Sequence, residues 1–340
     1  MHRLALDSIR ISSACKTLSV ALIATFLMAC EAELHLEGVE ASLAKPIRRT
    51  DQFTTVEPLA DGRVMLFADH GVIVEGAGGQ SGELEWTRSE LVDPAPNFIA
   101  STHCADGTVH ALSFGNSVWT TEGEGWRAHP VPTEEQLQAI ACSPRGDLWV
   151  VGSFGTIMRS GDGAMSWEEL SLYEDFTLTA VQFVDDEVGY TTGEFGTVVK
   201  TVDGGDSWEM LDPVNDDLYP LSMHFTDRDN GWVSGVLGLI MHTVDGGMTW
   251  SREDVDSEAA IYGFVVSNNQ LFAHGDLGAL LRFDGSAWVD YPSPDVPVHY
   301  ASAVTLSNGD LLLVGGWGLV VDLPIEVEGD KVASRTGETL

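Results

Sequence analysis

The chain has 340 residues, of which 44% are hydrophobic, with 36 glycines and 10 tryptophans. A chain of this length and composition folds around one large core or two small ones, which excludes a disordered protein. Its formal net charge of −35, from 52 acidic against 17 basic residues, disfavours nucleic acid and anionic lipid headgroups as partners. The negative charge therefore indicates either a cationic partner or simply a soluble surface.

The first thirty residues have the pattern of a secretory signal peptide. Arg3, Arg10 and Lys16 precede the apolar run "TLSVALIATFLMAC", which is shorter than the roughly 20 apolar residues of a membrane span. The ending "LMAC" resembles the lipobox of bacterial lipoproteins, which implies that Cys30 is acylated and becomes the first residue of the mature protein. An uncleaved anchor, or ordinary cleavage that leaves a free cysteine, are the two alternatives.

The sequence therefore predicts a lipoprotein signal peptide over residues 1–29 and a lipidated tether over residues 30–36. A protein anchored in this way lies at a membrane surface. The expected location is the bacterial cell envelope, with the folded part facing the periplasm. Whether the inner or the outer membrane holds the lipid stays open.

A unit of about 40 residues repeats between residue 51 and about residue 322. Tryptophans end six of the units at intervals of 40, 41, 41, 42 and 38 residues: Trp86, Trp126, Trp167, Trp208, Trp250 and Trp288. A glycine that closes a short turn recurs seven times in the same register: Gly71, Gly115, Gly155, Gly196, Gly238, Gly278 and Gly318. A period of this length is typical of repeat architectures.

Each unit predicts four short strands. In one unit they are "TLTAVQFV", "EVGYTTG", "TVVKTV" and "WEML", between residues 177 and 211. A single four-stranded sheet cannot bury both of its faces, whereas sheets packed radially bury each against its neighbours. The predicted fold is an all-β, seven-bladed β-propeller of four-stranded blades.

An eight-residue motif marks the hairpin between the third and fourth strands. It reads "TVDGGDSW" at 201–208, "TVDGGMTW" at 243–250 and "SGDGAMSW" at 160–167, and it is similar to the Asp-box, or bacterial neuraminidase repeat. We expect its aspartate to accept hydrogen bonds from its own turn and its tryptophan to fill the gap toward the next blade. The residues assigned this structural role are Ser160, Asp162, Trp167, Thr201, Asp203, Gly205, Trp208, Thr243, Asp245, Gly247 and Trp250.

The whole repeat, with a G-x-x-G pattern shortly before the box, resembles the photosystem II stability and assembly factor family of seven-bladed propellers. That resemblance implies a non-catalytic factor that binds another membrane or periplasmic protein and assists its assembly or operation. Relatives that occur beside exporters of the resistance-nodulation-division type imply a second setting. A glycan-binding or vestigial sialidase-like propeller is the alternative.

No enzyme, cofactor or metal site is predicted. A sialidase needs three arginines that clamp a carboxylate, and Arg63, Arg88 and Arg145 share no repeat position. The ten histidines show no tight ligand spacing. The "DGGDS" turn lacks the acid spacing and terminal glutamate of an EF-hand, although bound calcium, like a bound glycan, stays open.

Two cysteines, Cys104 and Cys142, fall in the predicted first strands of consecutive blades. An oxidising periplasm permits a bridge. However, equivalent strands of adjacent blades diverge, and a disulfide needs α-carbons within about 7 Å. The unbridged state is therefore favoured, and whether the two cysteines are bridged stays open.

The seventh unit has only three predicted strands and no final tryptophan. The N-terminal stretch 37–47 is predicted to supply the fourth strand, to pair with residues 319–323 and to close the ring. The predicted propeller then covers residues 37–325, and a flexible tail covers residues 326–340.

The turns between the second and third strands share one face of the predicted ring with the blade-to-blade connections. This face is predicted to be acidic and to bind the partner through Asp69, Glu194 and Asp276. Tyr173, Tyr219 and Tyr300 are expected to add aromatic contacts there. The expected partner is an envelope or membrane protein with a basic surface, bound by a monomer, and the opposite face is expected to be scaffold.

Overall fold

The computed structural model describes residues 37–78, 83–123, 125–214, 218–255, 257–294 and 296–326. The chain divides into two compact units, residues 1–45 and 46–340. The predicted signal peptide, the tether with Cys30, and the tail from residue 327 lie outside the described residues. In the part of the chain that is described, no helix is long and apolar enough to cross a membrane.

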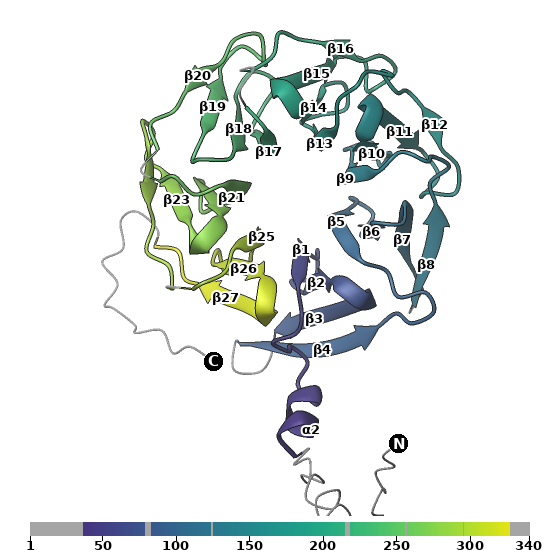
Figure 1. The fold of residues 1–340 in the computed structure, drawn as a ribbon, viewed down its shortest axis with the longest axis vertical. Coiled ribbons are helices and arrows are strands. Elements are labelled where there is room, and N and C mark those ends of the chain that lie inside the picture. The colour runs from purple at the N-terminus through teal and green to yellow at the C-terminus, as the bar shows by residue number, and fades with distance from the viewer. Residues whose placement is uncertain are drawn as a thin grey trace, which may run out of the picture. The chain divides into compact units, whose positions relative to one another are not determined.

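The second unit is a ring of seven antiparallel sheets, which confirms the predicted propeller (Figure 1). Six sheets have four strands, and within the described residues the seventh has three. In each blade the first strand lies nearest the centre of the ring and the later strands follow outward.

The strands of the first four blades are β1 (Phe53–Pro58), β2 (Val64–Ala68), β3 (Val72–Gly78), β4 (Leu84–Glu90), β5 (Phe98–His103), β6 (Val109–Ser113), β7 (Ser117–Glu122), β8 (Gly125–Pro130), β9 (Leu137–Cys142), β10 (Leu148–Gly152), β11 (Thr156–Ser160), β12 (Glu168–Glu169), β13 (Leu178–Phe183), β14 (Gly189–Gly193), β15 (Thr197–Thr201) and β16 (Glu209–Met210). The strands of the last three blades are β17 (Pro220–Phe225), β18 (Gly231–Gly235), β19 (Ile240–Thr243), β20 (Ser251–Arg252), β21 (Ile261–Ser267), β22 (Gln270–Gly275), β23 (Leu280–Phe283), β24 (Trp288–Asp290), β25 (Tyr300–Thr305), β26 (Leu311–Gly315) and β27 (Leu319–Leu323).

The second strand of each blade forms the centre of the core. Strands such as β10, "LWVVG", and β26, "LLLVG", are buried along their whole length. A strand with a neighbouring blade on each side buries both of its faces, so its sequence is a continuous apolar run rather than an alternation. The packed clusters that result join adjacent blades, as in the cluster that unites Leu148 and Val150 of blade three with Leu112 and Val118 of blade two.

Ring closure differs from the prediction that residues 37–47 form a strand. Glu37–Leu43 form helix α2, and its sequence "EGVEASL" contains the good helix formers Ala, Leu and Glu. Within the described residues β27 has no fourth-strand partner. Blade one instead packs directly on blade seven, with Phe53 and Val314 in one buried cluster. Within the described residues, apolar packing between blades one and seven closes the ring without a shared sheet.

Of the two alternatives for the cysteines, the favoured one is wrong, because Cys104 and Cys142 form a disulfide with α-carbons 5.4 Å apart. Cys104 directly follows β5, and Cys142 is the last residue of β9. These are the innermost strands of blades two and three (Figure 1). Radially arranged sheets diverge toward the rim, but their innermost strands converge at the centre, where the bridge lies.

Candidate functional site

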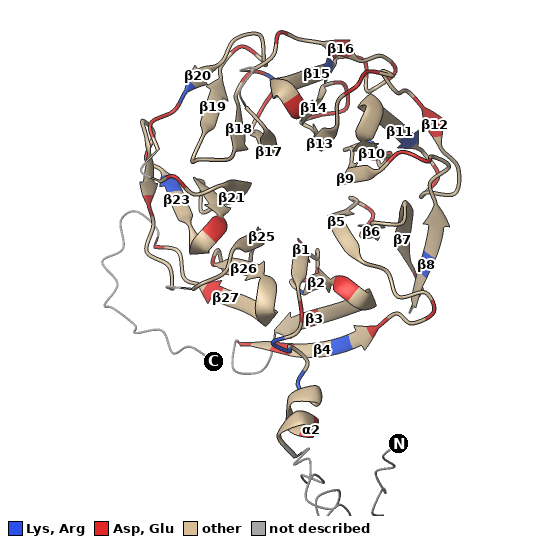
Figure 2. Ribbon diagram, viewed as in Figure 1, with Lys and Arg blue, Asp and Glu red and all other residues tan. Residues whose placement is uncertain are grey.

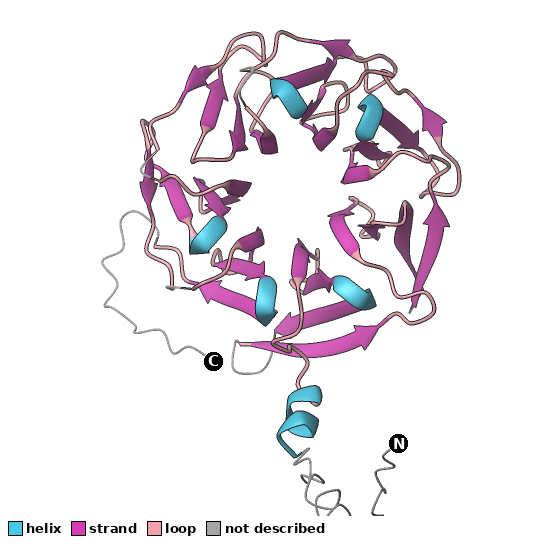
Figure 3. Cartoon of the chain, in the orientation of Figure 1, coloured by secondary structure: helices cyan, strands magenta, loops and turns pink. Residues whose placement is uncertain are grey.

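The turns between the second and third strands gather on one face of the propeller, which we call the turn face. Five of these turns are short 3-10 helices, and Figure 3 shows them spaced around the ring on the side toward the viewer. They are η1 (Asp69–Gly71), η2 (Ser153–Gly155), η3 (Glu194–Gly196), η4 (Asp276–Gly278) and η5 (Gly316–Gly318).

Four of the seven turns are tied in the same way to the chain that connects adjacent blades. The turn glycine donates its N–H to a carbonyl oxygen of that connection, as from Gly71 to Pro96 at 2.6 Å and from Gly155 to Phe176 at 2.9 Å. The same bond runs from Gly318 to Asp51 at 2.8 Å. A Cβ on Gly318 would lie only 2.3 Å from the Arg48 carbonyl oxygen, so this close approach requires glycine.

The three predicted acidic residues lie at the first position of three of these turns (Figure 2). Glu194 accepts a hydrogen bond from the Thr177 N–H at 2.7 Å. Asp276 accepts one from the Leu277 N–H at 2.9 Å. These two carboxylates therefore hold the local backbone as well as charging the face, and the turns that carry them are distributed around the ring rather than brought together.

The sequence reasoning missed the residue that follows. At six of the seven turns the position just before the glycine carries a large apolar side chain that is exposed, from 53% at Phe154 to 76% at Leu237. We call this set the apolar collar: Phe114, Phe154, Phe195, Leu237, Leu277 and Trp317. His70 holds the equivalent place in blade one. The signal was present in the sequence, as an apolar residue before six of the seven turn glycines.

Five collar residues have left-handed backbone angles, with φ between 52° at Leu277 and 60° at Phe195. Such angles are rare for bulky residues and cost roughly 1–3 kcal/mol each, whereas glycine or asparagine adopts them readily. An exposed apolar side chain gains little from burial that would offset this cost. Strain at equivalent positions in successive blades therefore points to function rather than to folding.

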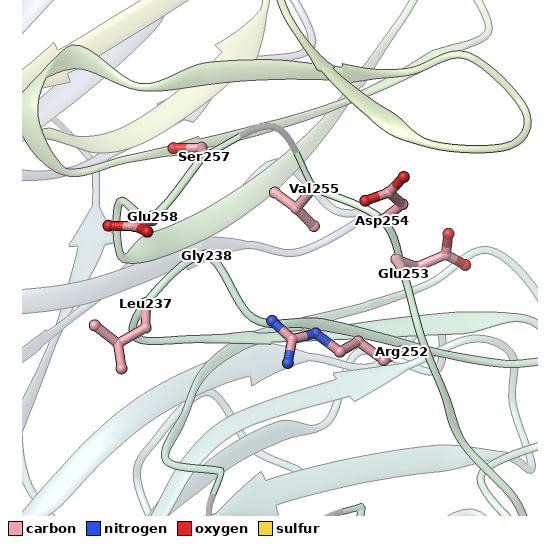
Figure 4. Close-up of a pocket in the computed structure, with 8 residues that line it drawn as sticks. All are labelled: Leu237, Gly238, Arg252, Glu253, Asp254, Val255, Ser257 and Glu258. Carbon is pink, nitrogen blue, oxygen red and sulfur yellow. The ribbon is translucent and has the colours of Figure 1, made fainter.

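A pocket of about 400 Å³ adjoins the collar at blade five and is lined by Leu237, Gly238, Arg252, Glu253, Asp254, Val255, Ser257 and Glu258. In Figure 4 the Arg252 side chain extends toward Gly238, while Glu253 and Asp254 point away from it. Glu253 instead pairs with His242, whose Nδ1 lies 2.9 Å from a carboxylate oxygen. The Arg252 guanidinium shares the pocket with the apolar side chains of Leu237 and Val255. The pocket can therefore bind a ligand that has an acidic or polar group beside an apolar one.

Two of the three expected aromatic residues are exposed, namely Tyr173 at 74% and Tyr219 at 43%. Tyr300 is fully buried, and its hydroxyl donates to the Pro294 carbonyl oxygen at 3.4 Å. The expectation that Tyr300 contacts a partner is therefore wrong, because it begins the innermost strand of blade seven and packs in the core.

The Asp-boxes lie on the opposite face, in the hairpins that lead to the fourth strands. Asp203 accepts hydrogen bonds from the Ser207 N–H at 2.9 Å and from the Ser207 and Thr201 hydroxyls. The Thr201 hydroxyl oxygen in turn accepts the Gly205 N–H at 2.8 Å. The same bonds form around Asp245 and Asp162. In these three turns the box side chains bind their own backbone.

These bonds have a consequence for stability at low pH. Hydrogen bonds from Ser207 lower the pKa of Asp203 to about 2, and those from Thr249 lower the pKa of Asp245 to about 2. Because both values lie below that of a free aspartate, near 3.8, these residues stabilise the fold above about pH 4 and lose the contribution as the pH falls toward 2.

We expect the double variant Asp203→Asn/Asp245→Asn to flatten the fall of Tm between pH 4 and pH 2, since an amide keeps the turn geometry but does not titrate. Thermal unfolding across this pH range measures the effect. Asp212→Asn, at an exposed residue outside the boxes, is the control and should keep the parent's slope. An equal slope in all three proteins would contradict the structural role of the boxes.

The described residues contain no group of three or more His, Cys, Asp or Glu placed to hold a metal ion. Ser101, His103 and Glu57 lie close together, but both the Ser101 hydroxyl and the His103 Nδ1 contact the Glu57 carboxylate, at 2.8 and 2.9 Å. The histidine does not contact the serine oxygen in this arrangement, so it cannot activate that oxygen as a nucleophile. The cluster ties the inner strands of blades one and two together.

Comparisons with known proteins agree with this architecture. The family model described as photosynthesis system II assembly factor YCF48 matches residues 117–215 and 162–259. YCF48 from Cyanidioschyzon merolae is similar in structure, with a TM-score of 0.64 and 13% identity over 82% of this chain and 96% of that one. YCF48 bound to a D1 peptide gives a TM-score of 0.65 and 16% identity over 83% and 94%.

An enzyme shares the same ring. A catalytically inactive histidine-to-alanine variant of virginiamycin B lyase from Staphylococcus aureus, solved with quinupristin, gives a TM-score of 0.69 and 14% identity over 82% of this chain and 96% of that one. None of the curated protein sequences matches the chain. The repeats, the ring of blades and the family match together show a seven-bladed propeller of BNR, or Asp-box, repeats that is similar to YCF48.

Proposed function

We propose that this propeller is a non-catalytic binding protein that holds another protein on its turn face. The observation that carries the proposal is the apolar collar, whose six side chains are exposed and whose backbone is strained at five equivalent turns. Exposed apolar side chains that recur in register form a surface that a partner can bury. The carboxylates of Asp69, Glu194 and Asp276 on the same turns favour a partner that carries basic groups.

The partner is an envelope or membrane protein, and the propeller assists its assembly or operation. A solved YCF48 propeller holds a D1 peptide, which supports a peptide segment as the bound element. This role takes one of two forms. The propeller assists the assembly of a photosystem-like membrane complex, or it is an accessory to an exporter of the resistance-nodulation-division type.

The propeller works on the periplasmic side of a membrane, tethered through lipid on Cys30 and active as a monomer. The signal-peptide and lipobox patterns at residues 1–30 support this location. The disulfide between Cys104 and Cys142 also supports it, because structural disulfides persist mainly in oxidising compartments.

The test exchanges three collar residues in the variant Phe154→Asn/Phe195→Asn/Trp317→Asn. Asparagine tolerates left-handed angles, so we expect Tm to be unchanged or higher while affinity for the partner falls at least tenfold. The partner is first obtained by crosslinking the tethered protein in the native envelope, and binding of the purified pair is then measured.

The control variant is Met165→Asn/Val202→Asn/Met248→Asn, which removes three side chains that are 59–73% exposed on the Asp-box face. It should bind like the parent. Unchanged binding by the collar variant, or loss of binding by the control, would place the site elsewhere. Cleavage of quinupristin by the purified protein would favour a lyase instead, and binding to a glycan array would favour the glycan-binding alternative.

A further inference from the structure

Blade seven differs from the other six blades at its outer edge. In the six complete blades a fourth strand covers the third, whereas within the described residues β27 has no strand beyond it. All seven blades are built from one repeat. The fourth strands of the six complete blades therefore show what kind of strand fits beside the outer edge of β27.

The hydrogen-bonding groups of that edge can be identified by register. In blades three, four and six the residue two positions after the turn glycine, Ile157, Val198 or Leu280, accepts a backbone N–H from the residue that directly follows the fourth strand, at 2.8–2.9 Å. The equivalent residue of blade seven is Val320, followed two positions later by Asp322. In the described part of the chain no strand bonds to the outward groups of these two residues.

Side-chain burial shows the same difference. In β11 and β15 four of the five residues are buried. In β27 none is buried, and Asp322 is exposed. Leu319, Val321 and Leu323 lie half-buried at the margin of the cluster between blades six and seven. An added strand would complete the burial of these apolar side chains.

The chain that follows β27 turns away from this edge. Ile325 is buried in the cluster between blades six and seven, and its N–H donates to the Asp310 carboxylate at 3.1 Å. The Glu326 carbonyl oxygen accepts a hydrogen bond from Gln270 of blade six. The described segment that leaves β27 therefore runs along blade six and does not fold back as a hairpin onto the open edge.

Charge identifies the kind of strand that fits. In blades three and four the position equivalent to Asp322 carries a cation, Arg159 or Lys200, directly opposite a glutamate of the fourth strand. Arg159 and Glu168 form an ion pair at 2.6 Å. In blade seven the sign is reversed, and no cation pairs with Asp322 among the described residues. Although Asp322 is exposed, the protein atoms around it exclude part of its water, and this desolvation together with the neighbouring Asp310 raises the pKa of Asp322, so a nearby cation would stabilise its charge.

We propose that the outer edge of β27 binds an extended segment of a partner protein as the fourth strand of blade seven. The segment runs antiparallel to β27 and places a lysine or arginine opposite Asp322 and an apolar residue, two positions later, opposite Val320. Main-chain hydrogen bonds provide affinity and the two side chains provide specificity, as in other cases of strand addition. The inference is argued from the edge of β27 and not from the apolar collar, so it does not depend on the proposed function.

The probe is a synthetic peptide of residues 166–171 of this chain carrying Glu168→Lys, which ends before the position opposite Gly318, where the Arg48 carbonyl oxygen lies. In its own blade Glu168 lies opposite Arg159, so the substituted peptide presents a cation to Asp322 and Leu170 to Val320. The unsubstituted peptide is the matched control and would place two like charges opposite each other. Amide NMR of the full chain should show shifts at Val320 and Asp322, with the lysine peptide binding at least several-fold more tightly at low salt.

Two variants test the geometry. Val320→Pro removes an outward N–H without breaking the ladder to β26, and it should abolish binding while the protein stays folded. Asp322→Asn should bind both peptides equally. Unchanged binding to Val320→Pro, or equal binding of the two peptides to the parent, would overturn the proposal.

The parent alone provides a further check. If the Val320 and Asp322 amides are already protected from exchange without peptide, the edge is occupied. Loss of that protection in a chain ending at residue 326 would assign the edge to the chain's own tail, and loss on dilution would assign it to a second copy. Either result overturns the assignment to a partner.

Discussion

Replacing Gly205 by alanine is expected to lower the free energy of unfolding by about 2–4 kcal/mol, because it combines overpacking with a left-handed backbone angle. Gly205 has φ of 89°, and a Cβ there would lie 2.1 Å from Cη2 of Trp149. The indole of Trp149 is fully buried and cannot retreat. Urea denaturation of parent and variant measures the difference.

Blade three supplies the matched control, because its Asp-box carries Ala164 at the equivalent position, with φ of 72°. The second strand of the preceding blade has His110 where blade three has Trp149, so the residue equivalent to Trp149 is smaller in this case. Ala164→Gly should therefore change the free energy of unfolding by less than about 1 kcal/mol. In a Trp149→His background the cost of Gly205→Ala should also fall. A cost that is the same in both backgrounds would show that the indole does not impose the glycine.

The spacing of tryptophans and glycines was sufficient to predict the fold and the number of blades, because each repeat must place the same turn at the same point. It also placed the Asp-boxes and the acidic turns on opposite faces. These features depend on local geometry and strand alternation, which a sequence displays directly. The closure between Phe53 and Val314 could not be predicted in this way, because it depends on packing between residues far apart in the chain.

The collar was missed for a different reason. Charge drew attention to the first turn position, at Asp69, Glu194 and Asp276, and the apolar residue that follows was left without a role. A phenylalanine or leucine before glycine is ordinary in a strand sequence. Only the structure shows that Phe195 and Leu277 have left-handed backbone angles and exposed side chains. Such local disagreement between residue type and conformation is a mark of functional positions.

Replacing both bridged cysteines by serine, as Cys104→Ser/Cys142→Ser, is expected to lower the free energy of unfolding by roughly 3–4 kcal/mol. The bridge spans 38 residues and links the innermost strands of blades two and three. A closed loop of that size removes substantial entropy from the unfolded chain. Denaturation with and without dithiothreitol measures the effect.

Dithiothreitol should destabilise the parent by a similar amount and leave the serine variant unchanged. An unchanged parent whose thiols are shown by alkylation to be reduced would contradict this expectation. The disulfide also bears on where the protein works. A chain kept reduced in the cytosol would lose the stabilisation from the disulfide, whereas a chain exported to an oxidising compartment would keep it. Material purified from the periplasm should therefore melt at a higher temperature than the same chain purified from a reducing cytosol, and oxidation of the cytosolic material should remove the difference.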